Sequence, residues 1–342
     1  MNKVLSVSVA AYNVENCIEK CLESLLKTDV AEKIEIIVID DGSTDSTWNI
    51  IEKFKSHYST SIIAVKKENG GHGSTINVGI QKASGKYFKI VDADDWVDKS
   101  GFENLVRFLE NTDVDMVLNP FYSIYEGGDN YTKKLQSPFN QIKTEKVYKF
   151  EDIYEKIQMP MHGVTFKTGI LKKMGPIIDE NCFYVDTEYI MYPLLFVNTL
   201  ICLEAPVYYY LLGNVNQSVS LINMVKRRNQ REHVIYSLVK YFNKFDQNIS
   251  SEKRKYYIKT LQGVIGAHYK YFMYIDDNTV SVAEIKRFDS WLKNNANNEI
   301  YYGLKKSLIM KFIRIQRKTV FVFLKPSIFI VQKMLKIFRK VK

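Results

Sequence analysis

Cysteine is scarce in this sequence, with four residues among 342. None of them belongs to a paired zinc-ligand pattern, and Cys17 and Cys21 lie four positions apart on one face of an expected helix. We therefore expect reduced packing residues in a cytoplasmic protein, not disulfides or a zinc site. No apolar run reaches the roughly 18 to 20 residues of a membrane-spanning helix, and the first residues lead directly into a strand-like segment, so we expect no secretory signal.

Acidic side chains are absent from residues 301–342, which hold 12 basic residues. The whole chain has 48 basic and 38 acidic residues, a formal charge of +10, so residues 1–300 keep 36 basic residues and carry −2. A near-neutral body without a recognition motif argues against nucleic acid as a partner. Apolar residues at helical spacing between the lysines predict a basic amphipathic tail. It would contact the inner face of the plasma membrane, contact another copy of the chain, or extend into solvent.

Strands and helices are expected to alternate over the first 120 residues. Apolar and β-branched runs predict the strands, and apolar residues at helical spacing predict the helices between them. The expected strands are 4–11, 34–39, 61–65, 86–91 and 114–118. This alternation predicts right-handed βαβ units and an α/β fold with a mainly parallel sheet flanked by helices.

The rest of the chain has a less regular pattern. Residues 122–148 are expected to form a hairpin or a long surface excursion, followed by a helix at 187–197 and an aromatic strand at 207–211. From residue 221 to 292 the spacing of apolar residues predicts only helices.

Polar or glycine-rich segments follow four of the expected strands. They are Tyr12-Asn13, Asp40-Asp41-Gly42, the segment from Asn69 to Gly73, and Asp92-Ala93-Asp94-Asp95. Because the carboxyl ends of parallel strands meet at one edge of a sheet, we expect these segments to converge there. Carboxylates gathered at such an edge repel one another unless a cation compensates them. The Asp-x-Asp therefore predicts a hard divalent ion, Mn²⁺ or Mg²⁺, that bridges to a diphosphate.

In this order and spacing, the motifs resemble those of the family 2 inverting glycosyltransferases, a large group found in bacteria. The resemblance rests on Ser6–Asn13, Ile37–Asp45, Glu68–Gly71, Asn77–Ile80, Ser84–Tyr87 and Val91–Asp95. It is strong over residues 1–120 and weak as far as residue 221. It implies a Rossmann-like GT-A fold in residues 1–220, with a nucleotide-sugar half (1–120) and an acceptor half (121–220). A helical region (221–300) and the basic tail (301–342) would follow.

The resemblance also implies roles for residues along the donor nucleotide sugar. Asp41 would contact the base or ribose, and Asp92 and Asp94 would hold the metal ion against the diphosphate, with Asp95 as a helix cap or a support for the ligands. The other implied donor-binding residues are Ala11, Tyr12, Asn13, Asn69, Gly70 and Ala93. Ile76 stands where many relatives have an arginine, so diphosphate binding would depend on the metal or on another cation.

An inverting transfer needs a base that removes the proton of the acceptor hydroxyl. Relatives carry an acidic pair before a helix in the acceptor half, and the matching segment here is Phe183–Tyr189, in which Val185 replaces the usual first acid. Asp186 is the first choice for the base and Glu188 is the alternative. The structural alternative is a helix N-cap for Asp186 with Glu188 in the first helical turn, and capping does not exclude catalysis.

Four further residues are candidates for contacts with the acceptor or for a loop that closes over the donor. His72 lies in the glycine-rich turn and His162 before a short expected strand, and each has a structural alternative as a turn-stabilising or packing residue. Gln217 and Ser218 lie in a polar segment that resembles a loop near the diphosphate in relatives, with an ordinary loop as the alternative.

The function that the resemblance implies is metal-dependent transfer of a hexose from a nucleotide sugar, with a UDP-sugar favoured. The acceptor would be a glycan, a glycoprotein or a lipid-linked sugar. Two alternatives remain at this point: a scaffold that binds the sugar nucleotide without catalysis, and a nucleotidyltransferase. The second is disfavoured because Ala11-Tyr12-Asn13-Val14-Glu15 offers no basic glycine-rich loop after the first strand.

Overall fold

The computed structural model describes residues 3–127, 130–175, 178–212, 221–272, 274–275 and 278–304. Two compact units are distinguished along the chain, residues 1–257 and 258–342. The tail expected after residue 301 lies outside the described residues from residue 305 onward. The domain boundaries expected at residues 220 and 300 stay predictions. Among the described residues, no helix combines the length and apolar character that crossing a membrane requires.

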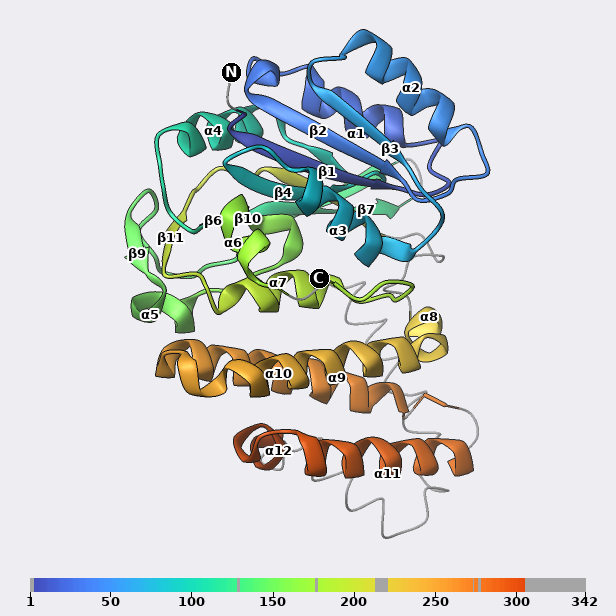
Figure 1. The fold of residues 1–342 in the computed structure, drawn as a ribbon, viewed down its shortest axis with the longest axis vertical. Coiled ribbons are helices and arrows are strands. Elements are labelled where there is room, and N and C mark those ends of the chain that lie inside the picture. The colour runs from blue at the N-terminus through green and yellow to red at the C-terminus, as the bar shows by residue number, and fades with distance from the viewer. Residues whose placement is uncertain are drawn as a thin grey trace. The chain divides into compact units, whose positions relative to one another are not determined.

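The first unit is built on an eight-stranded sheet (Figure 1). The strands β1, β2, β3 and β4 are mutually parallel, as are β6 and β11, whereas β10 runs antiparallel to both β4 and β6. In spatial order the strands are β3 (Ile62–Lys66), β2 (Ile34–Asp40), β1 (Leu5–Ala11), β4 (Tyr87–Asp92), β10 (Val164–Lys167), β6 (Met116–Leu118), β11 (Thr199–Cys202) and β9 (Val147–Lys149). The predicted α/β fold with a mainly parallel sheet is confirmed, and the insertion of β10 is a feature that the sequence pattern did not predict.

Helices cover both faces of this sheet, as Figure 1 shows. On one face lie α1 (Ile18–Leu26), α2 (Thr47–His57) and α4 (Lys99–Glu110), whose buried side chains form one apolar cluster with β1, β2 and β4. On the other lie α3 (Gly71–Lys82), α6 (Thr168–Lys173) and α7 (Asp186–Leu194). Every residue of β2 is buried because both faces are covered, which explains why its sequence is apolar except for Glu35 and Asp40.

A second, four-stranded sheet joins β5 (Trp96–Val97), β12 (Tyr208–Leu212), β7 (Phe121–Gly127) and β8 (Asn130–Gln136) in that order. The antiparallel pair of β7 and β8 is the hairpin that the sequence suggested for this region. Of the two alternatives for residues 122–148, the hairpin is therefore correct.

The remaining described elements are mostly helical. They are α5 (Phe150–Ile153), the short 3-10 helix Met161–Gly163, α8 (Leu221–Lys226), α9 (Arg228–Phe245), α10 (Ser251–Phe272), α11 (Asn278–Asn295) and α12 (Asn298–Leu304). The helices expected between residues 221 and 292 are present, although the first is interrupted at Arg227. In the second unit, Tyr269 and Tyr301 both donate hydrogen bonds to the buried carboxylate of Asp289.

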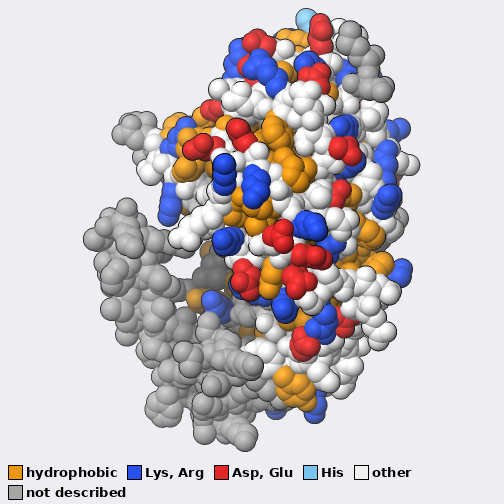
Figure 2. Space-filling model, turned by 90° about the vertical axis from the view of Figure 1, so that its left-hand side faces the viewer, with side chains coloured by type: hydrophobic (Ala, Val, Ile, Leu, Met, Phe, Trp, Pro, Cys, Tyr) orange, Lys and Arg blue, Asp and Glu red, His pale blue; other side chains and the backbone are white. Residues whose placement is uncertain are grey.

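The surface charge is mixed. On the face drawn in Figure 2, Lys and Arg side chains are interspersed with Asp and Glu side chains and do not gather into one basic area. This agrees with the formal charge of −2 on residues 1–300, and the described part of that face offers no broad basic surface.

Candidate active site

Tyr12 and Asn13 follow β1 and differ in their surroundings. The Tyr12 side chain is 50% exposed, next to the buried Ala11. Asn13 has a φ of 52°, and its side-chain oxygen accepts a hydrogen bond from the Thr44 amide at 2.8 Å. Asn13 thus ties the segment after β1 to the segment after β2, while Tyr12 leaves an aromatic surface open. Their predicted contact with a nucleoside stays a prediction.

Asp41 follows β2 and is buried among hydrogen-bond donors. Its Oδ1 accepts from Lys67 Nζ at 2.7 Å and from the Gly70 amide at 3.0 Å, and its Oδ2 accepts from the Gly71 amide at 2.8 Å. Ser74 Oγ donates to Oδ1 as well, at 3.3 Å. The carboxylate therefore holds the first turn of α3, where helix amides attract negative charge. The contact with base or ribose that the resemblance implies for Asp41 stays a prediction, as do those of Asn69 and Gly70.

The glycine-rich turn is also the point where α3 meets the segment that leads to α7. A Cβ at Gly73 would lie 1.9 Å from the Asp179 carbonyl oxygen, so only glycine fits this approach. The Asn181 amide donates to the Gly70 carbonyl at 2.5 Å. On the next turn of α3, Asn77 exchanges two hydrogen bonds with the backbone of Ile178, both at 2.9 Å. These glycines thus serve close packing of two backbone segments.

Asp92 and Asp94 lie at the end of β4 with little compensation for their charge. Asp92 is half-buried and Asp94 is exposed, with the buried Ala93 between them. The imidazole of His72 lies beside Asp92, with Nε2 3.5 Å from Oδ1. Burial raises the pKa of Asp92 to about 6, His72 opposes that shift, and the charges of Asp94 and Asp186 add to it. His72 therefore faces the carboxylates, and Asp186 lies within electrostatic range of them.

Asp95 is buried and supports this turn from behind. Tyr208 donates to its Oδ2 at 2.6 Å, and the Leu211 amide donates to its Oδ1 at 2.7 Å. The Tyr208 hydroxyl also accepts from the Asp92 amide at 3.1 Å, so it bridges the two ends of the turn. Asp95 does not cap the following helix, since the cap of α4 is Asp98, which accepts from the Gly101 amide at 2.9 Å.

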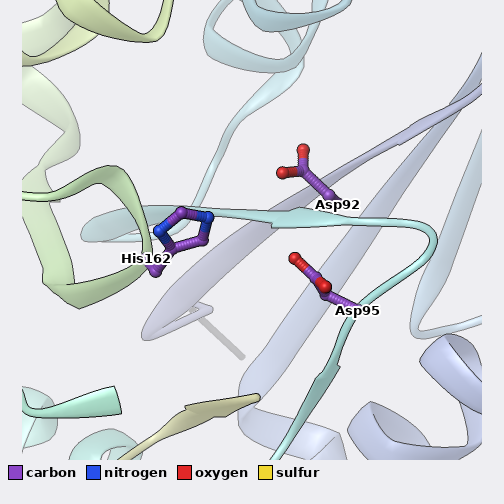
Figure 3. Close-up of side chains that lie close together, drawn as sticks. All are labelled: Asp92, Asp95 and His162. Carbon is purple, nitrogen blue, oxygen red and sulfur yellow. The ribbon is translucent and has the colours of Figure 1, made fainter. Parts of the chain in front are cut away.

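His162 meets the same carboxylates from another part of the chain (Figure 3). Ligand atoms of Asp92, Asp95 and His162 all lie within 4.8 Å of one another. The imidazole stacks on Tyr210, with ring centroids 4.0 Å apart. Burial, with the charge of Lys89 as the next cause, lowers the pKa of His162 to about 3. The ring is therefore neutral at physiological pH, and it is both a packing residue and a possible metal ligand.

Lys89 lies fully buried in β4 and fixes the backbone around His162. Its Nζ donates to the His162 carbonyl at 2.8 Å and to the Val164 carbonyl at 3.3 Å. Burial lowers the pKa of Lys89 to about 7. Sequence reasoning did not single out this residue. A lysine inside an otherwise apolar strand was the available signal.

The two acids of α7 have opposite environments. Asp186 is the first residue of the helix and is exposed, and the N-cap position is taken by Val185. Glu188 is fully buried and accepts hydrogen bonds from the Asp179 amide at 2.9 Å and from the Tyr192 hydroxyl at 3.1 Å. Burial raises the pKa of Glu188 to about 8. The alternative role of Asp186 as the helix cap is therefore wrong, and of the two acids Asp186 is the exposed one, with a charge that acts on Asp92.

Gln217 and Ser218 lie outside the described residues, so no position is assigned to them. Tyr208 and Tyr210 are site residues that the sequence reasoning missed. The aromatic strand was recognised, and period-two alternation within it would have placed both tyrosines on one face. The sequence did not indicate that this face packs against the turn after β4.

The family model for "Glycosyl transferase family 2" matches residues 6–174. An uncharacterized glycosyltransferase of Haemophilus influenzae is 31% identical over 251 residues, which cover 69% of this chain and 75% of that protein. The chain belongs to glycosyl transferase family 2. Both carboxylate groups at the strand ends and His162 lie within the segment that the family model matches.

Other members share shorter segments with this chain. Glycosyltransferase GlyA of Streptococcus pneumoniae is 33% identical over 170 residues, covering 49% of this chain and 24% of that protein. The chain spans less than half of the length of GlyA and of two other curated relatives, with shares between 20% and 43%. The structure of residues 1–349 of TarS from Staphylococcus aureus, in complex with UDP-GlcNAc, has a TM-score of 0.67 at 19% identity, covering 92% of this chain and 88% of that one. This likeness confirms the predicted GT-A fold.

Proposed function

We propose that this protein transfers a hexose, with inversion, from a UDP-sugar to a glycan, glycoprotein or lipid-linked acceptor. The observation that carries the proposal is the convergence of Asp92, Asp94 and Asp186 at the end of β4 and the start of α7. The charges of Asp94 and Asp186 both add to the raised pKa of Asp92, so each of them lies within electrostatic range of it. The UDP-GlcNAc bound in the structural neighbour supports a UDP-sugar as the donor class.

The residues after β4 fit a divalent cation. The charge of Asp92 is poorly compensated by the described residues, and Asp94 offers a second oxygen ligand beside it. Both oxygens of Asp95 already accept hydrogen bonds, which favours Asp92 and Asp94 as the ligands. Mn²⁺ or Mg²⁺ at this position would offset the charge that develops on the leaving nucleoside diphosphate.

Asp186 is the proposed general base. Its exposed carboxylate is able to accept the proton of the acceptor hydroxyl as that oxygen attacks the anomeric carbon. Glu188 is less suited, because a buried acid with a pKa of about 8 is mostly protonated at neutral pH and its oxygens are already hydrogen-bonded. A role of the tail at a membrane and a cytoplasmic location stay predictions.

A matched pair of variants tests this assignment. Transfer and donor hydrolysis are measured for a panel of UDP-sugars that includes UDP-GlcNAc, with and without Mn²⁺, for the wild type, Asp186→Asn and Glu188→Gln. We expect metal-dependent turnover in the wild type, a loss of at least about 100-fold in Asp186→Asn with UDP-sugar binding retained, and a small change in Glu188→Gln. Nucleotide binding without turnover would favour a scaffold, and a larger loss in Glu188→Gln would reverse the choice of base.

A further inference from the structure

Tyr210 lies on the face of β12 that is turned toward the carboxylates. Side chains alternate along a strand, so Tyr208 and Tyr210 share one face and Tyr209 points to the other. The Tyr208 hydroxyl contacts both Asp92 and Asp95, which places this shared face against the turn after β4. On the opposite face, Tyr209 donates to Asp98 at 2.7 Å.

The ring of Tyr210 is held in place by His162. The two ring centroids are 4.0 Å apart and the ring planes differ by 26°. The same imidazole has a nitrogen within 4.8 Å of the Asp92 and Asp95 carboxylates. Tyr210 is half-buried, so it forms part of the accessible wall of the site beside these carboxylates.

The Tyr210 hydroxyl lies within electrostatic range of both halves of the site. Among the described residues it has no hydrogen-bond partner, in contrast to the hydroxyls of Tyr208 and Tyr209. Burial raises its pKa, and the charges of Asp95, Asp92, Asp186 and Asp94 raise it further, in that order. The phenol therefore keeps its proton and remains a hydrogen-bond donor at physiological pH.

In an inverting displacement, the geometry of the reaction determines where the hexose lies relative to Asp92, Asp94 and Asp186. The leaving diphosphate and the base are on opposite sides of the anomeric carbon, so the hexose lies between Asp92 with Asp94 and Asp186. A side chain that is near the Asp92 and Asp94 pair and also near Asp186 therefore borders the hexose. We propose that Tyr210 contacts the transferred hexose, with its phenol donating a hydrogen bond to a hydroxyl of the sugar, and thereby contributes to the choice of sugar. This inference rests on the proposed function.

Calorimetric binding of UDP and of a UDP-sugar tests the contact. The UDP-sugar is the member of the donor panel that the wild type binds most tightly, and both ligands are measured with Mn²⁺ for the wild type, Tyr210→Phe and Tyr209→Phe. Tyr210→Phe keeps the ring that stacks on His162 and removes only the hydroxyl. We expect about 5- to 10-fold weaker binding of the UDP-sugar by Tyr210→Phe with unchanged UDP binding. Tyr209→Phe, altered at the neighbouring residue on the opposite face, should bind both ligands as the wild type does.

Three results would count against the contact. Equal weakening of UDP and UDP-sugar binding in Tyr210→Phe would place the hydroxyl at the diphosphate, and no weakening of either would remove it from the donor site. Equal effects of Tyr209→Phe and Tyr210→Phe would indicate a general disturbance of β12. A wild type that binds neither UDP nor any UDP-sugar would refute the proposed function itself, and that result is obtained before any variant is compared.

Discussion

The aspartates after β2 and after β4, the two strands that flank β1, look alike in the sequence and differ in the structure. Asp41, after β2, has four hydrogen-bond donors around its carboxylate, one of them the Lys67 ammonium. Asp92, after β4, has a pKa that burial raises and that the charges of Asp94 and Asp186 raise further, while His72 Nε2 lies 3.5 Å from its Oδ1. A carboxylate with its partners already in the protein stabilises the fold, whereas a cluster of poorly compensated carboxylates is suited to binding a cation. The following variants test this difference, from the largest expected effect to the smallest.

Replacing Asp94 by asparagine should reduce metal-dependent transfer by at least about 100-fold, because one of two proposed ligands loses its charge. The rate is measured with a UDP-sugar at saturating Mn²⁺. Asp113→Asn is the control, since Asp113 is an exposed aspartate in the segment between α4 and β6, paired with Lys167 at 2.8 Å. An Asp94→Asn enzyme with wild-type rates would contradict the metal assignment.

Asp41→Asn and Asp92→Asn should change the free energy of unfolding in opposite directions. Asp41→Asn leaves the partly buried Lys67 ammonium without its counter-charge and should cost about 2 to 3 kcal/mol. Asp92→Asn removes a poorly compensated charge and should leave stability unchanged or raise it by about 1 to 2 kcal/mol. Urea unfolding in metal-free buffer measures both. If both variants were destabilised by the same amount, Asp41 and Asp92 would not differ in how well the protein compensates their charges.

Gly73→Ala should destabilise the protein by about 2 kcal/mol, because its new methyl group would overlap the Asp179 carbonyl oxygen. Gly169→Ala is the matched control within α6, where a Cβ would meet no atom within 4 Å, and it should be neutral or stabilise by up to about 1 kcal/mol. Thermal unfolding compares the two. If Gly73→Ala were as stable as the control, the segment before α7 would not be held by the α3 turn that Asp41 organises.

Glu188 should make stability depend on pH. Its folded-state pKa of about 8 lies above the ordinary value of 4.5, so its contribution is complete below about pH 4.5 and is lost as pH rises through about 8. Between pH 6.5 and 7.5 the wild type should lose about 1 kcal/mol relative to Glu188→Gln. Urea unfolding at the two pH values measures the difference. Parallel pH profiles would show that Glu188 is not held protonated.

The sequence predicted the parts of the fold that depend on local pattern. The alternation of apolar runs located β1, β2, β3 and β4 to within a residue or two, and turn chemistry located Asp41 and Asp92 at their ends. The parts that were missed depend on contacts distant in sequence. The insertion of β10 between β4 and β6 has no periodic signal, and the bond from Tyr208 to Asp95 joins residues 113 positions apart.

The same limit applies to the site. Burial distinguishes Glu188 from Asp186 although both are acids in the first turn of one helix, and a single sequence carries no direct measure of burial. The glycine-rich turn illustrates another limit. Its residues indicate a tight connection between strand and helix, but the backbone that packs against Gly73 comes from residues more than 100 positions later.

The position of β10 has a consequence for synthesis of the chain. Strands β1 to β4 are complete at residue 92, yet β4 and β6 keep open edges until residues 164–167 have left the ribosome. Open edges of this kind favour pairing with other chains. The two carbonyl groups that later bind the Lys89 amine belong to His162, just before β10, and to Val164, the first residue of β10. Until those residues are made, we expect the Lys89 side chain to be hydrated, and a lysine on an open strand edge disfavours pairing with other chains.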